Sequence, residues 1–165
     1  MNTPMKISRF AEALGQPRRL VQNWRDTDVL ADRLESYEGI RDRSLFDDGE
    51  LTIALALIPL AVGGVRGPAL VRIARAIRDA GEEGFGVPIR RAFDRAKADK
   101  PAWLAVHFYR NTGGEQLPEP RGVTTERQLV KLIDKLADED TPVIVVDLRR
   151  ALARWRELER ETEDE

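Results

Sequence analysis

Two short helical patterns separated by a glycine dominate the start of the chain, between residues 7 and 26. In the first pattern, apolar residues recur three and four positions apart, which is the spacing of one helix face. These residues are Ile7, Phe10, Ala11 and Leu14. Gly15 can adopt the positive φ that ends such a helix, and Pro17 favours the first turn of the next one. The sequence therefore predicts a helix over 7–14, a tight turn, and a second helix over 17–26.

The second of these helices begins with two arginines, Arg18 and Arg19. A helix, a tight turn and a basic second helix form the plan of helix-turn-helix DNA-binding proteins, whose second helix enters the major groove. Positive side chains at a helix N-terminus oppose the helix dipole, so this placement favours a bound anion. The alternative is that the two arginines form only a solvated start of the helix.

The residue types along the second helix suit contacts with bases. An arginine can donate two hydrogen bonds to guanine, and the amides of Gln22 and Asn23 offer the donor and acceptor that adenine requires. Further basic residues are expected to contact phosphates, which fix position without reading sequence. We expect Trp24 to pack in the core. The predicted DNA-binding residues are Arg18, Arg19, Gln22, Asn23, Arg25, Lys6, Arg41 and Arg43.

Residues 7–60 resemble the winged helix-turn-helix of MerR-type transcriptional regulators. That pattern has an opening Ile-x-x-Leu-Ala-x-x-Leu-Gly, an aromatic at the end of the recognition helix, an aliphatic pair, and an acidic cap with leucine after the wing. Asp28 stands where the family usually has glycine. The matching residues are Ile7, Phe10, Ala11, Leu14, Gly15, Trp24, Val29, Leu30 and the run from Phe46 to Leu51. The resemblance implies a recognition helix at 17–25 and a wing near 37–46.

The net charge of −2 is unevenly distributed along the chain. Residues 1–25 contain five basic residues and one acidic residue, and residues 66–100 contain nine basic and five acidic residues. Residues 111–165 contain nine basic and fourteen acidic residues. Basic segments beside an acidic C-terminal third suggest one end for phosphates and another for a different partner, although solvated helix faces would give the same count.

Helical patterns continue after a small expected hairpin within 27–46. Asp47 followed by Glu50 is typical of a capping box, which predicts a third helix that Pro59 and Gly63-Gly64 end or kink. Gly67-Pro68 begins a fourth helix, on which three arginines could extend the phosphate-binding surface or form a solvated face. They are Arg72, Arg75 and Arg78. A short basic helix is expected near 88–99.

After Pro101 the spacing changes to that of strands. Alternation over 103–109 and the apolar run 142–146 predict two strands, and a loop with Gly113-Gly114 and two prolines follows the first. Thr125 and Gln128 cap a helix between the strands, and a last helix is expected over 147–162. The fold class is thus α+β, mainly α, with a C-terminal βαβα unit whose crossover allows parallel strands.

Two strands do not form a stable sheet alone, so we expect this unit to be used for dimerisation or for docking a partner protein. The final helix has an apolar stripe that could serve as this interface, or could cover the chain's own strands. The stripe consists of Leu148, Leu152, Trp155 and Leu158.

Other classes of function lack support in the sequence. The chain has no cysteine and a single histidine, His107, so no metal ligand set is recognisable. We expect no enzyme activity, no metal and no cofactor. No signal peptide is evident, and the apolar stretch 51–65 is shorter than the roughly 20 residues that span a bilayer. These features predict a cytoplasmic, nucleoid-associated protein without a membrane partner.

The sequence therefore predicts a sequence-specific transcription regulator that binds double-stranded DNA as a homodimer. Its expected parts are a DNA-binding domain at 1–65, a helical connector at 66–100 and the βαβα unit at 101–165. An alternative is a phage-derived DNA-packaging protein of the small-terminase type or an architectural DNA-binding protein. A third possibility is an adaptor that has lost DNA binding and contacts another protein through its C-terminal unit.

Overall fold

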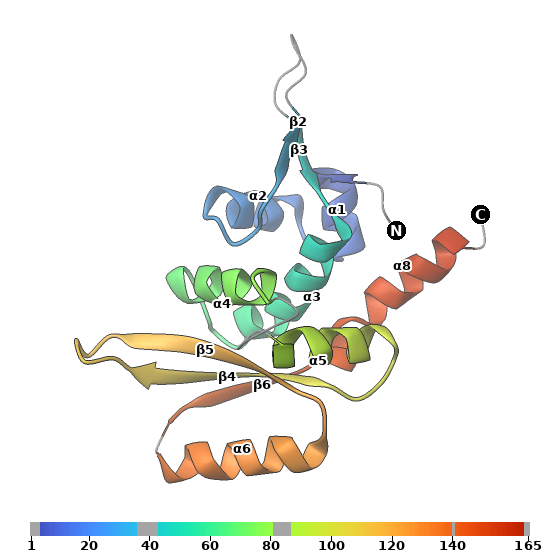
Figure 1. Ribbon diagram of the computed structural model, residues 1–165. Coiled ribbons are helices and arrows are strands. Elements are labelled where there is room, and N and C mark those ends of the chain that lie inside the picture. Colours follow the sequence, from blue (N-terminus) through green and yellow to red (C-terminus); the bar gives the residue numbers. More distant parts are fainter. Residues whose placement is uncertain (1–3, 36–42, 81–86, 140, 164–165) are drawn as a thin grey trace.

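The computed structural model describes residues 4–35, 43–80, 87–139 and 141–163. It is an α+β structure and mainly helical, as expected. Figure 1 shows a small N-terminal group of helices and strands, then further helices in the middle, then a second sheet whose far face is covered by a helix. The middle helices therefore pack between the two sheets.

The N-terminal elements lie close to their predicted positions. α1 (Ile7–Ala13) and α2 (Arg18–Asp26) are joined at Gly15, whose φ is +62°. Three short strands form an antiparallel sheet in the order β1-β3-β2. They are β1 (Met5–Lys6), β2 (Arg33–Glu35) and β3 (Arg43–Phe46). The hairpin expected within 27–46 is therefore present as the β2–β3 pair.

The predicted apolar stripe of α1 is buried. Phe10 is fully buried, and its ring lies 4.5 Å from that of Phe46 on β3, centroid to centroid. Trp24 of α2 is also buried, as expected. Burying aromatic side chains of this size supplies much of the stabilisation available to so small a unit. The three elements α1, α2 and β3 thus share one core.

α3 (Asp48–Val62) is the central helix. Its predicted cap is confirmed, because the carboxylate of Asp47 accepts a hydrogen bond from the backbone N–H of Glu50 at 2.9 Å. The helix is buried on nearly all sides from Leu51 to Leu57 rather than along one stripe. Pro59 lies on its exposed side and does not end it, since the helix continues to Val62.

The second sheet differs from the predicted βαβα unit. Its strand order is β5-β4-β6, and β4 pairs with both neighbours in the antiparallel sense. α6 joins β5 to β6 across the far face of the sheet, while α3, α4 and α5 lie on the other face (Figure 1). The elements are α4 (Pro68–Arg78), α5 (Val87–Lys97), β4 (Trp103–Arg110), β5 (Gln116–Val123), α6 (Glu126–Asp138) and β6 (Val143–Asp147).

Strand β5 occupies the segment that the glycines and prolines led us to expect as a loop. Its prolines fit because of the hydrogen-bond register. The backbone N–H of Phe108 donates to Pro142, and that of Leu148 donates to Ala102, so the even-numbered residues of β4 bond toward β6. The odd-numbered residues then bond toward β5, and Pro118 and Pro120 face away from the ladder.

The last helical segment is broken at Leu152 into α7 (Leu148–Ala151) and α8 (Ala153–Glu163), where one helix was expected. Leu148 and Leu152 are fully buried, and Trp155 is 5% exposed. The indole N–H of Trp155 donates to the carboxylate of Asp48 at 2.7 Å. Leu148, Leu152 and Trp155 form part of the chain's own core, and the half-buried Leu158 packs against it, so the stripe covers the chain's own elements, which was the alternative expectation.

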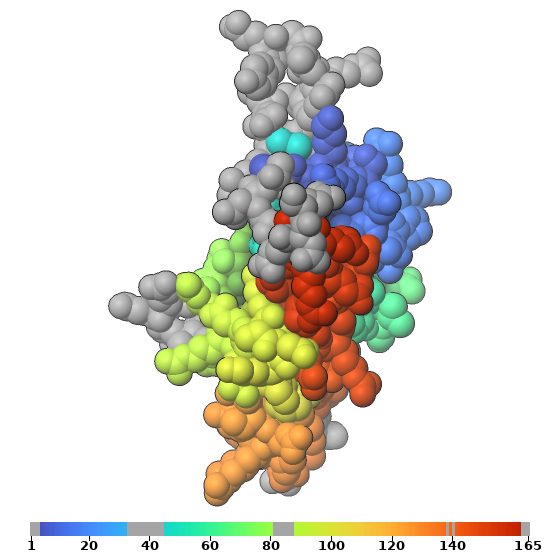
Figure 2. Space-filling view, turned by 90° about the vertical axis from the view of Figure 1, so that its right-hand side faces the viewer, coloured from blue at the N-terminus to red at the C-terminus, as the bar shows by residue number. Residues whose placement is uncertain are grey.

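One continuous apolar cluster extends from Met5 to Trp155, across the domain boundaries expected at residues 65 and 100. Figure 2 shows α8, in red, running over the surface between the N-terminal helices and α5. The end of the chain therefore packs on its beginning, because α8 contacts both α1 and α3.

Candidate nucleic-acid interface

The two sides of α2 differ in exposure. Val21 and Trp24 are 0% and 4% exposed and fix the helix to the core. Arg18, Arg19 and Asn23 are exposed on the opposite side, and Gln22 is half-buried beside them. The four residues predicted to contact bases therefore share one accessible helix face, since positions 18, 19, 22 and 23 are neighbours on a helix surface.

The N-terminus of α2 is electropositive. Its N-cap is Pro17, no side chain caps its free N–H groups, and its first turn contains no acidic residue. Within the described part of the chain, neither Arg18 nor Arg19 forms an ion pair. The two guanidinium groups and the positive end of the helix dipole thus lie together, and no ion pair in the described structure neutralises the two arginines.

The residues predicted to contact phosphates differ from one another in their surroundings. Lys6 is exposed on β1. Arg25 donates to the adjacent Asp26 from Nε at 2.8 Å and from Nη2 at 2.6 Å, so its charge is shared with a carboxylate. Arg43 stands on β3 opposite Glu35. Arg41 lies outside the described residues. Figure 1 shows β2 and β3 beside α1 and α2.

The arginines of α4 do not form one basic surface. Arg78 donates to Glu50 from Nε at 2.6 Å and from Nη2 at 2.9 Å, and this hydrogen bonding raises the pKa of its guanidinium. It also donates to the carbonyl of Val29 at 3.2 Å. Arg72 forms an exposed ion pair with Glu115. Arg78 therefore has a structural role, and of the three only Arg75 is exposed without an ion pair in the described chain.

Sequence reasoning placed Glu50 in a capping box and missed its second role. One oxygen of its carboxylate accepts from Arg78, and the other accepts from both Arg78 and the backbone N–H of Ala31 at 3.1 Å. This carboxylate thus connects α3, α4 and the segment that leads into β2. A glutamate with only 8% of its side chain exposed requires such partners, because an unpaired buried charge is costly.

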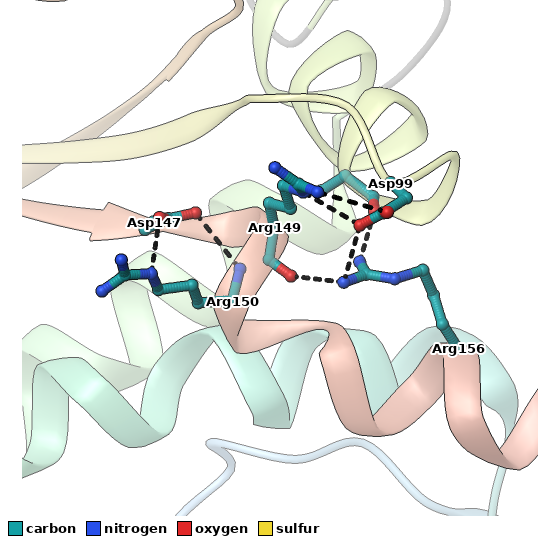
Figure 3. Close-up of polar contacts among 6 residues, drawn as sticks. Asp99, Asp147, Arg149, Arg150 and Arg156 are labelled. Carbon is teal, nitrogen blue, oxygen red and sulfur yellow. Dashed lines mark hydrogen bonds and ion pairs between the residues drawn. The ribbon is translucent and has the colours of Figure 1, made fainter.

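A second ion cluster joins α5 to α7 and α8 (Figure 3). Asp99 accepts hydrogen bonds from Arg149 at 2.9 and 3.3 Å, and Arg156 lies 3.1 Å from it. Arg156 also donates to the carbonyls of Ala96 and Arg149. The hydrogen bond from Arg149 lowers the pKa of Asp99. These contacts hold α7 and α8 against the end of α5. They are distant in sequence from α2.

His107 is buried on the face of the second sheet that α6 covers. Its Nε2 lies 3.2 Å from the carboxylate of Glu119, and its buried Nδ1 has no hydrogen-bond partner in the described structure. No group of three His, Asp or Glu side chains in the described ranges is arranged to hold a metal ion. Over the same ranges, no helix is both long and apolar enough for a bilayer crossing.

No family model matches the sequence, and a search of the curated proteins finds no match to it.

Proposed function

We propose that the chain is a sequence-specific DNA-binding protein of the winged helix-turn-helix kind, similar to MerR-type transcriptional regulators. The exposed face of α2 carries this proposal. It presents Arg18, Arg19, Gln22 and Asn23, while Val21 and Trp24 anchor the opposite side in the core. A recognition helix needs this division, because the side chains that contact bases must be free while the helix is held rigidly.

The surrounding elements support the same function. In winged-helix proteins a hairpin beside the recognition helix contacts the DNA backbone, and β2–β3 has that position in the order of the chain. Asp28 has a φ of +60°, a conformation that favours glycine, and MerR-type sequences usually have glycine there. The positive φ of Asp28 in the turn after α2 supports the proposed likeness.

Each side chain has a distinct role in this proposal. Arg18 and Arg19 contact guanines, and the amides of Gln22 and Asn23 contact adenines. Lys6 and Arg43 contact phosphates, which sets the position of the protein on the duplex. Arg25 contributes less to affinity, since Asp26 already neutralises part of its charge.

Selection from a random duplex library followed by titration of the selected site tests the proposal. We expect the wild-type chain to enrich a defined sequence. Arg18→Ala with Arg19→Ala should remove about 1–3 kcal/mol of discrimination for each arginine that reads a base. Both residues are exposed, so circular dichroism and the unfolding midpoint should not change.

The matched control removes two exposed arginines from α4, as Arg72→Ala with Arg75→Ala. It lowers the net charge by the same amount and should leave the sequence preference intact. Enrichment of no sequence, or equal preference in the folded α2 double variant and the wild type, would contradict a base-reading role for α2.

A further inference from the structure

The two edges of the β5-β4-β6 sheet are protected to different degrees. On β5, the residues that face away from β4 include Pro118 and Pro120, which have no backbone N–H to offer another strand. Proline at the outward positions of an edge strand is one way in which proteins prevent strands of other chains from pairing. The β5 edge is therefore closed to pairing along most of its length.

The β6 edge lacks this protection. Ile144 and Val146 bond to β4, so the backbone N–H and C=O groups of Val143 and Val145 point away from the sheet. Elsewhere in the described chain, no backbone group bonds to these two residues. Residues 143–146 are all β-branched, with neither a charge nor a proline among them. Such a strand favours pairing with a further strand.

Helix α6, which precedes β6 in the chain, also has exposed apolar side chains. Leu132 and Gln128 line a recess against β5, on one side of the helix. Val130 and Ile133 lie on the exposed side of α6, turned away from Leu132 and from the buried Leu136. They are 56% and 37% exposed. The same unit thus has an open strand edge on β6 and exposed apolar side chains on α6.

We propose that a second copy of this chain pairs with β6, in the antiparallel sense and centred on Val145. The outward residues of β6 are the first, third and fifth of its five residues, so the strand is symmetric about Val145. In this register Val145 exchanges two hydrogen bonds with the partner subunit's Val145, and Val143 faces the partner subunit's Asp147. A two-fold interface requires such self-complementarity, and the product is one six-stranded sheet.

The charges at the two ends of β6 favour a copy in this orientation. Glu139 precedes the strand and lies 3.8 Å from Lys135, and Arg150 follows it and lies 3.4 Å from Asp147; both ion pairs are at the surface, with 53% of the Glu139 side chain and 89% of the Arg150 side chain exposed. An antiparallel pair places Arg150 near the partner subunit's Glu139 at both ends of the interface. A parallel pair would instead bring like charges together, which is unfavourable. This interface does not depend on DNA binding, so it holds or fails separately from the function proposed for α2.

Proline at position 145 tests the interface. Val145→Pro gives β6 the protection that β5 already has, and it removes no hydrogen bond to β4 because the Val145 N–H faces outward. We expect sedimentation equilibrium to give twice the 18.7 kDa chain mass for the wild type and the single chain mass for Val145→Pro. Val145→Thr keeps the N–H and the branched shape, so it should remain dimeric.

Amide hydrogen exchange of the wild type provides a second test that does not rely on a folded proline variant. In the proposed dimer, the amides of Val143 and Val145 exchange as slowly as those of Ile144 and Val146. A monomeric wild type, a folded Val145→Pro variant that remains dimeric, or rapid exchange at 143 and 145 beside slow exchange at 144 and 146 would overturn the proposal.

Discussion

The carboxylate of Glu50 accepts two hydrogen bonds from the guanidinium of Arg78, with distances of 2.6 Å to Nε and 2.9 Å to Nη2. The two residues lie in the first turn of α3 and the last turn of α4. Because Glu50 also accepts from the N–H of Ala31, this one pair connects the middle helices to the segment before β2. It therefore stabilises the position of the hairpin relative to α2.

Removing one member of this pair should destabilise the protein strongly. Arg78→Ala leaves the Glu50 carboxylate buried without its cation, and we expect a loss of about 3 kcal/mol in the free energy of unfolding. Urea denaturation at neutral pH measures this value. The exposed Arg75→Ala is the control from the same helix and should change stability by less than about 0.5 kcal/mol. An equal, small effect of both substitutions would show that the pair contributes little.

Acid should weaken the Asp99 cluster. The hydrogen bond from Arg149 lowers the pKa of Asp99 in the folded chain below its unfolded value, which is about 3.9. A lowered pKa adds stability above the unfolded pKa, and this contribution is lost as the pH falls through the folded pKa. Asp99→Asn should therefore be less stable than the wild type at neutral pH, and the difference should shrink below about pH 4.

Asparagine is suited to this comparison because it tolerates the φ of +55° at position 99. Thermal unfolding of both proteins over a pH series measures the difference. A gap between the two that stays constant down to about pH 3 would mean that the ionisation of Asp99 is not its cause.

Replacing Gly122 with a residue that has a Cβ should destabilise the protein. A Cβ there would overlap the carbonyl of Pro88 and lie 2.5 Å from the Cα of Ile89, both in the first turns of α5. Because backbone atoms cannot move aside cheaply, Gly122→Ala should cost about 2 kcal/mol or more of stability. Gly113→Ala, in the exposed turn of the β4–β5 hairpin, is the control: its Cβ would lie 3.3 Å from the Asn111 side chain and would meet no backbone atom within 4 Å, so it should cost much less in the same denaturation assay.

Replacing Asp28 with glycine should stabilise the protein. Its φ of +60° is unfavourable for residues with a Cβ, and its side chain is exposed. We expect Asp28→Gly to stabilise the chain by about 0.5–1 kcal/mol, in spite of the greater freedom of glycine in the unfolded state. Asp28→Asn removes the charge and retains the Cβ, so an equal gain in unfolding midpoint from asparagine and from glycine would show that removal of the Cβ is not the cause.

A substitution in the hairpin separates phosphate contact from base reading, within the proposed function. Arg43→Ala should weaken binding to all DNA sequences about equally and should lower the slope of log affinity against log salt by about one unit. Titrations at several salt concentrations, with the selected site and with an unrelated duplex, measure both quantities. A changed preference between the two duplexes with an unchanged slope would indicate that Arg43 reads bases.

Local sequence determined most of the helices. The apolar spacing from Ile7 to Leu14, the turn at Gly15 and the caps at Asp47 and Thr125 each act within a few residues, and the structure has all of them. The contrast between the buried and exposed sides of α2 was also predictable, because periodicity alone places Val21 and Trp24 opposite Arg18.

Only the tertiary structure decided the pairing of strands and the partners of side chains. Pro118 and Pro120 predicted a loop from the sequence. They fit in strand β5 only because of its hydrogen-bond register with β4, and the local sequence does not show that register. From the sequence, Arg78 could not be distinguished from a solvated arginine, because its ion-pair partner Glu50 is 28 residues away. The stripe from Leu148 to Trp155 had the spacing of an interface, yet the core of the same chain buries it. Periodicity states which face of an element is apolar, whereas what covers that face depends on contacts between distant residues.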